Sequence, residues 1–165
     1  DKEEIGYLAT RLVEQYHKTI MPKVKPLHTE QYVEVEFDNN PYIAGVRGTI
    51  DLITQDMELV DVKTAGSLAN NLQTKHELQL SIYTLLAKKS AMQITGAKIH
   101  EIIKPTSTMD VRTRIVPIEL QEKKADEMLE QLASRIADFF RAVNGEPILD
   151  PANLFHIDNK EYLYA

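Results

Sequence analysis

The sequence predicts an α/β fold in which helices flank a central mixed β-sheet. Amphipathic helical patterns alternate with short runs rich in β-branched residues, which is typical of this class. One such run follows a helix that itself follows a strand, the arrangement of a parallel crossover. With 165 residues, of which 43% are hydrophobic and 27% charged, the chain has the size and composition of one globular domain. We therefore expect a single domain over residues 1–165.

The first half of the chain predicts a helix followed by a three-stranded antiparallel meander. The helix ends before a proline-bounded linker at 22–26. Alternating residues at 32–37 predict a strand that pairs with a second strand at 46–54. A tight turn at 55–56 leads to a third strand at 57–64. The apolar face of the helix is made of Ile5, Leu8, Leu12, Val13, Tyr16 and Ile20.

The second half predicts a helix, two strands and a long final helix. A polar loop at 65–73 precedes the helix at 74–89, and the strand at 96–104 should lie parallel to the third strand of the meander. A further strand is expected at 112–118 and the last helix at 119–143. These elements form an α/β sandwich, with the candidate site at an edge of the sheet.

Three ionisable residues are predicted to meet on the hairpin. Asp61 and Lys63 share one strand face because side chains two apart point the same way. The turn places Asp51 across from them. Two carboxylates close together are tolerated when a divalent cation sits between them, and Mg²⁺ prefers such oxygen ligands. The alternative is an unremarkable hairpin with a turn carboxylate and a solvated charge pair.

The motifs G-x-x-D at 48–51, D-x-K-T at 61–64 and Q-x-x-x-Y at 79–83 stand in this order. Together they resemble the PD-(D/E)XK nuclease superfamily. The nearest resemblance is to its RecB-like exonuclease branch, which includes phage, CRISPR-associated and mitochondrial genome maintenance exonucleases. The resemblance implies a PD-(D/E)XK nuclease core and a Mg²⁺- or Mn²⁺-dependent deoxyribonuclease, more specifically an exonuclease of DNA repair, recombination or phage DNA processing.

The resemblance also implies roles for individual residues. The catalytic residues would be Asp51, Asp61, Lys63 and Gln79, and the metal ligands His17, Asp51, Asp61 and the carbonyl of Val62. Tyr83, Arg47 and Thr64 are assigned to substrate binding. Glu14 rivals His17 as the helix ligand, and an imidazole would shift the preference toward Mn²⁺. His76, one turn before Gln79, could touch substrate, but we expect it to be an exposed helix residue.

Composition limits the partners and the compartment. The net charge of −6 argues against a large basic surface, so DNA would be held by local cations such as Arg47 and Lys63. The chain has no cysteine, which excludes a cysteine-held iron–sulfur cluster within it. No apolar run has membrane-spanning length and no signal-peptide pattern is present, so we expect an intracellular, cytoplasmic protein. The missing initial Met suggests a trimmed preceding segment.

Other functions remain open. A structure-specific endonuclease could use the same residues, and a non-catalytic nuclease-fold module could bind DNA or act as a scaffold. A phosphohydrolase of small nucleotides is less favoured because no phosphate-binding glycine loop is present. The resemblance further implies a helicase or recombinase as a partner. Gly48 either leaves room for a DNA phosphate or reflects a twisted strand.

Overall fold

The protein, represented by a computed structural model, is described over residues 2–37, 40–68, 71–150 and 152. Its order of helices and strands is that predicted from the sequence. The elements are α1 (Lys2–Thr19), the 3₁₀ turn η1 (Met21–Lys23), β1 (Pro26–Glu36), β2 (Gly45–Thr54), β3 (Glu58–Ala65), α2 (Leu72–Lys89), β4 (Gly96–Ile103), β5 (Arg112–Ile118) and α3 (Glu122–Asn144).

The five strands form one mixed sheet in the order β1-β2-β3-β4-β5. Neighbouring strands are antiparallel except β3 and β4, which are parallel and joined through α2. The turn between β2 and β3 is closed by a hydrogen bond from the Met57 N–H to the Thr54 carbonyl at 2.9 Å. The predicted meander and parallel crossover are therefore confirmed.

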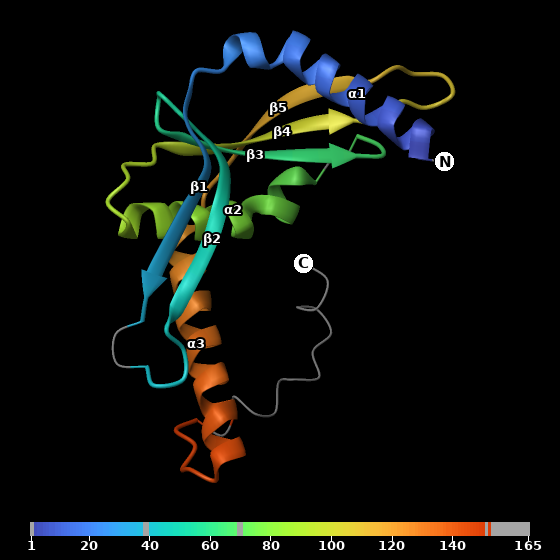
Figure 1. Ribbon diagram of the computed structural model, residues 1–165. Helices are drawn as coiled ribbons and strands as arrows, with labels where there is room; N and C mark the ends of the chain where they lie inside the picture. Colours follow the sequence, from blue (N-terminus) through green and yellow to red (C-terminus); the bar gives the residue numbers. More distant parts are fainter. Residues whose placement is uncertain (1, 38–39, 69–70, 151, 153–165) are drawn as a thin grey trace.

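Helices cover both faces of the sheet (Figure 1). On one face, Leu12 of α1 packs with Ile102 and Val111. On the other, Leu80 of α2 joins the main core, which includes Leu59 and Ile99. α3 packs against α2 and runs in the same direction as the β1–β2 hairpin, where Phe140 of α3 stacks on Tyr42 of the loop between the two strands. In the described residues, no helix combines the length and apolar character needed to cross a membrane.

Three details differ from the sequence-based expectations. β1 begins at Pro26, so the first strand takes in most of the stretch between the expected linker and residue 32. Ile5 and Val13 are exposed, because only the narrower stripe of α1 that carries Leu12 meets the sheet. The buried stripe of α2 contains Leu80, Thr84 and Ala87. The larger apolar residues Leu78, Ile82 and Leu85, from whose helical spacing a core-facing stripe is expected, are only partly buried.

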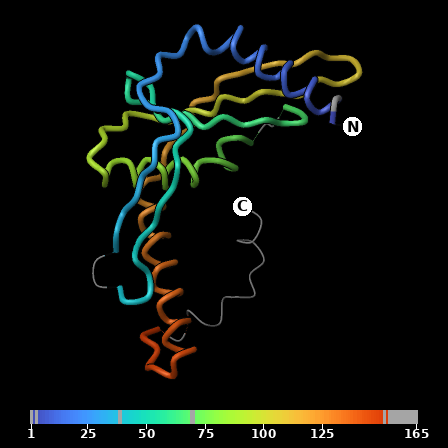
Figure 2. Tube along the Cα trace, in the orientation of Figure 1, coloured from blue at the N-terminus to red at the C-terminus, as the bar shows by residue number. Residues whose placement is uncertain are grey.

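The sheet opens between β2 and β3. β2 is paired with β3 through Leu52↔Val60 and Ile53↔Leu59, while β1 and β2 stay paired along the whole hairpin. Figure 2 shows β1 and β2 turning away from β3 beyond this point. The separation begins at Asp51, the residue before Leu52. The candidate site consequently lies between the second and third strands, in the middle of the strand order and not at a lateral edge as expected.

Candidate active site

Asp51 occupies the point where β2 and β3 separate. Its Oδ2 accepts a hydrogen bond from the backbone N–H of Val62 at 2.9 Å. This N–H lies beyond the last β2–β3 residue pair, so a side chain replaces the strand partner that has turned away. The geometry brings the Asp51 carboxylate against the D-x-K stretch of β3, as the hairpin argument predicted.

Asp61 is the buried member of the site. It is 4% exposed, and Lys63 Nζ lies 3.1 Å from its Oδ2. The Gln79 amide of α2 donates a long hydrogen bond, 3.5 Å, to its Oδ1. Oδ2 is buried and, within the described residues, accepts no hydrogen bond. Its contact with Lys63 is therefore an ion pair without hydrogen-bond geometry. A buried carboxylate oxygen in this state can accept a further cation.

His76 belongs to the same cluster, contrary to the expectation that it is exposed. It is buried in α2, and burial, together with the charges of Lys63 and Lys75, lowers the pKa of its imidazole. Asp61 and a bond with Gln79 act in the opposite direction. A neutral His76 therefore adjoins the ion pair near pH 7. The feature of the sequence that indicates burial of His76 is its position four residues before Leu80, which puts both side chains on the same face of the helix.

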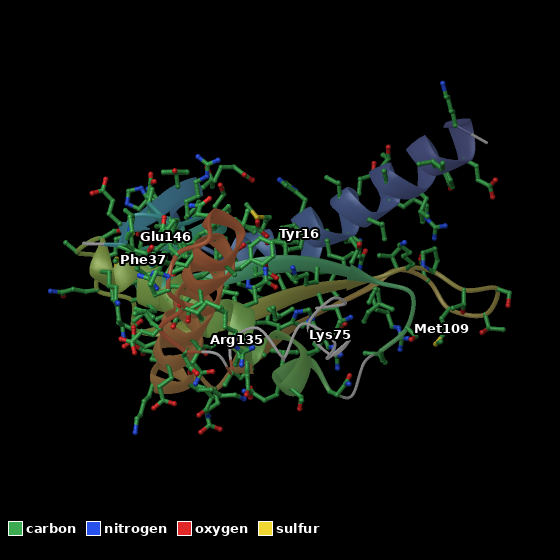
Figure 3. The ribbon with its side chains drawn as sticks, turned by 90° about the horizontal axis from the view of Figure 1, so that it is seen from below. Tyr16, Phe37, Lys75, Met109, Arg135 and Glu146 are labelled. Carbon is green, nitrogen blue, oxygen red and sulfur yellow. The ribbon has the colours of Figure 1, made fainter. Side chains whose placement is uncertain are left out.

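On the other face of the sheet, Tyr16 of α1 approaches the site. Its hydroxyl is hydrogen bonded to Nδ1 of His100 at 2.9 Å. Burial and the negative charge of Asp51 raise the pKa of the Tyr16 phenol. Figure 3 labels Tyr16 near the end of α1 and Lys75 on α2. Sequence analysis counted Tyr16 as a core residue only, and nothing in its helical spacing distinguishes a site residue.

The two metal ligands predicted on α1 lie on its exposed surface. His17 and Glu14 are exposed, whereas burial, and then the negative charge of Asp51, raises the pKa of the neighbouring Tyr16. Within the described residues, no group of three or more His, Cys, Asp or Glu side chains is arranged to hold a metal ion. The role of His17 stays a prediction.

The three residues predicted to bind substrate lie on three different elements, β2, β3 and α2. Thr64 is exposed on β3, directly after Lys63. The Tyr83 ring packs on Gly48, where an added Cβ would lie 2.9 Å from Cε1 of the ring. Gly48 thus makes room for this ring, a reason that neither expectation for the glycine included. Arg47 is exposed on the hairpin and paired in register with Glu34.

The donors that do meet suit a hard divalent cation. Asp51 and Asp61 supply carboxylate oxygens, and the Val62 carbonyl belongs to the residue whose N–H binds Asp51. Mg²⁺ takes one or two carboxylates from the protein and keeps several waters. The buried, unbonded Oδ2 of Asp61 is consistent with such an ion. An oxygen-only set of this kind favours Mg²⁺ over softer metals.

The family of the chain follows from comparison with known proteins. The family model of the PD-(D/E)XK nuclease superfamily matches residues 2–150. The chain therefore belongs to the PD-(D/E)XK nuclease superfamily. No curated protein matches the chain.

Solved structures share the fold. A protein of Eubacterium rectale, provisionally named an exonuclease, matches with a TM-score of 0.60 and 16% identity over 84% of this chain and 53% of its own. SSO0001 matches with a TM-score of 0.48 and 17% identity over 77% of this chain and 56% of its own. At these identities the first likeness shows the fold alone, and the second carries no further argument. The chain spans about half the length of each of these two proteins.

Proposed function

We propose that the protein is a metal-dependent DNA nuclease that hydrolyses phosphodiester bonds. One observation carries the proposal: Asp51 and Asp61 converge where β2 leaves β3, with Lys63 Nζ 3.1 Å from Asp61. Membership of the nuclease superfamily supports it. Two carboxylates beside one ammonium form a site for phosphodiester hydrolysis, because a cation and a lysine together can stabilise charge on an attacked phosphate.

The proposed roles follow from the contacts. Asp51, Asp61 and the Val62 carbonyl would hold Mg²⁺ or Mn²⁺, with His17 as a further proposed ligand. The metal would supply Lewis-acid activation of the phosphate and of water. Lys63 is partly exposed, with 33% of its side chain accessible, so its ammonium can reach both Asp61 and an incoming phosphate.

Gln79 and His76 support the site from α2. The amide of Gln79 donates to Asp61 Oδ1, so the orientation of that carboxylate depends on the helix. His76 has a lowered pKa and stays neutral, which keeps a further positive charge away from Lys63. Tyr83, Thr64 and Arg47 are proposed to contact the DNA strand.

We propose exonuclease activity in preference to endonuclease activity. The set of motifs in this sequence resembles the RecB-like branch, and the similar protein of Eubacterium rectale carries an exonuclease name. A role in repair, recombination or phage DNA processing, with a helicase or recombinase partner, is proposed on the resemblance alone.

The test is cleavage of end-labelled linear and closed circular DNA in Mg²⁺, Mn²⁺ or EDTA. The parent should degrade linear DNA only, and only with metal. Lys63→Ala should lose at least about 100-fold in rate, since the charge that stabilises the attacked phosphate is removed. Lys98→Ala is the matched control, because Lys98 has the same 33% side-chain exposure and pairs with Glu58 on β3.

The outcomes separate the candidate functions. Loss of circular DNA would indicate an endonuclease. A parent that binds DNA yet cleaves neither form in any metal would overturn the catalytic proposal in favour of a scaffold.

The variant His17→Ala tests the proposed helix ligand. If the imidazole binds the metal, the substitution should reduce the cleavage rate more in Mn²⁺ than in Mg²⁺. Unchanged activity in both metals would remove His17 from the ligand set.

A further inference from the structure

Lys63 has two carboxylates near it on the face of the sheet that α2 covers. Its Nζ lies 3.1 Å from Oδ2 of Asp61, which stands two positions earlier on β3. The parallel register places Glu101 of β4 beside Lys63. Lys63 and Glu101 share this face, because Leu59 and Ile99 of the core that α2 joins stand an even number of residues before them. One ammonium therefore has two anionic partners to choose from.

Glu101 is a buried carboxylate held by an arginine of the next strand. It is 1% exposed, and Nε of Arg114 on β5 donates to its Oε2 at 2.5 Å. An apolar pair at such a place is often as stable as a buried ion pair, so stability alone does not explain a carboxylate here. The two oxygens of a carboxylate offer about four acceptor positions. The bond from Arg114 therefore leaves Glu101 able to accept from a second donor.

A metal ion held by Asp61 would compete with Lys63 for the same carboxylate. Oδ2 of Asp61 is buried and, among the described residues, accepts no hydrogen bond, and the ammonium of Lys63 compensates its charge. Two positive charges beside one carboxylate oxygen repel each other. Lys63 would consequently need another partner in the metal-loaded protein, and Glu101 is the carboxylate that the strand register places next to it.

We propose that Glu101 is a positioning residue for Lys63: in the metal-loaded protein Lys63 turns from Asp61 to Glu101, and Arg114 holds Glu101 in place for this exchange. The inference rests on the proposed nuclease function and deepens it. An ammonium fixed by Glu101 keeps its place in the site, whereas one without a partner would turn into solvent, to which 33% of the Lys63 side chain is accessible. Without Glu101, the displacement of Lys63 would also weaken metal binding.

The experiment measures the affinity for Mg²⁺ alone by isothermal titration calorimetry, in a cycle of four proteins. The double variant E101Q/R114Q removes both charges of the buried pair, so that no buried ion is left unpaired. It is made once with Lys63 and once with Lys63→Gln. With Lys63, the double variant should bind Mg²⁺ about 10-fold more weakly than the parent, a size typical of coupling within one charge network. With Lys63→Gln it should cause no loss, because no ammonium is displaced.

The matched control is E58Q/K98Q. Glu58 and Lys98 form an ion pair of the same 2.5 Å length, also between neighbouring strands, but neither residue is the register partner of Lys63. This control should leave the affinity for Mg²⁺ unchanged with Lys63 and with Lys63→Gln. If E101Q/R114Q weakens Mg²⁺ binding equally in the two backgrounds, Glu101 acts through the fold and the exchange of partners is overturned.

Crystal structures of the parent protein with and without Mg²⁺ test the exchange directly, and they decide it even if E101Q/R114Q does not fold. With Mg²⁺, Nζ of Lys63 should lie within about 4 Å of the Glu101 carboxylate, the distance of an ion pair. Without Mg²⁺ it should contact Asp61, as it does here. A lysine that stays on Asp61 in the presence of Mg²⁺, or that turns into solvent, overturns the proposal.

Failure of this inference differs from failure of the proposed function. A parent that binds no Mg²⁺ and cleaves no DNA removes the proposed function, and the exchange of partners with it. A parent that binds Mg²⁺ and cleaves DNA, but whose affinity for Mg²⁺ does not depend on Glu101 in the presence of Lys63, overturns the positioning role alone.

Discussion

At the scale of single residues, Asp51 has two properties that can be tested separately. It is a predicted metal ligand, and it also accepts the Val62 N–H that strand pairing leaves without a partner. One carboxylate therefore fills the gap in the sheet and, in the proposed function, would also hold the metal. The two roles can be separated because only one of them needs a negative charge.

Substitution of Asp51 by Asn or Ala separates these roles. Both variants lose the charge and should lose cleavage. The Asn amide oxygen can still accept from Val62, whereas Ala leaves that N–H unpaired, so Asp51→Ala should be less stable than Asp51→Asn by about 1 kcal/mol. Urea unfolding of the two inactive variants measures the difference. Equal stabilities would mean that water satisfies the Val62 N–H and that the bond does not hold the strands.

Sequence analysis named the residues of the hairpin and Gln79 of α2, and missed His76 of α2 and Tyr16 of α1. Asp61 and Lys63 are placed by the two-residue period of a strand, which allows little choice. His76 was missed because the face of α2 that packs on the sheet was predicted from the positions of the largest apolar side chains. The buried stripe uses Leu80, Thr84 and Ala87 instead, since small residues let α2 lie close to the sheet, and His76 continues that stripe.

At the scale of elements, the contact between β2 and α2 depends on Gly48. The Tyr83 ring occupies the place where a side chain at residue 48 would begin. Through this contact the hairpin that carries Asp51 and the helix that carries Gln79 keep a fixed separation. The Q-x-x-x-Y motif thus has a packing role at Tyr83 and a polar role at Gln79.

Gly48→Ala should destabilise the protein by about 1 kcal/mol, because the new Cβ forces the Tyr83 ring from its place. Alanine otherwise favours folding over glycine, so Gly66→Ala is the control: an added Cβ there meets nothing within 4 Å. In a Tyr83→Leu background, which lacks the ring atom concerned, Gly48→Ala should cost less. Additive effects in this double-mutant cycle, measured by thermal or urea unfolding, would contradict the contact.

At the scale of the whole molecule, the strand order was predictable and the opening of the sheet was not. Alternation and the helix between two strands determine the meander and the parallel crossover. Whether two strands stay paired along their length depends on what packs against each of them. Here β1 and β2 turn away together from β3, and Glu30, which the register places opposite Asp51, has a left-handed φ of 50°. No local pattern in the sequence marks that distortion.

The packing of α1 on the sheet leads to a pH dependence of stability. His100 of β4 is 2% exposed and bonds to the Tyr16 hydroxyl. Burial, with the nearby Lys98 ammonium as a further cause and Glu58 acting in the opposite direction, lowers its pKa from 6.5 to about 4. The folded state therefore resists protonation of a group that the unfolded chain protonates near pH 6.5.

The sign of the effect follows from proton binding. Above pH 6.5 His100 is neutral in both states, and below about pH 4 it is protonated in both. Between these values only the unfolded state binds the proton, so the free energy of unfolding falls as the pH falls, by up to about 3 kcal/mol in all.

The variant His100→Gln, which keeps an acceptor for Tyr16, should flatten the dependence of the free energy of unfolding on pH in this range, whatever its stability at pH 8. His28→Gln, on the exposed start of β1, should not. Urea unfolding of the three proteins between pH 4 and 8 measures the slopes, and a slope that His100→Gln leaves unchanged would assign the loss to other groups.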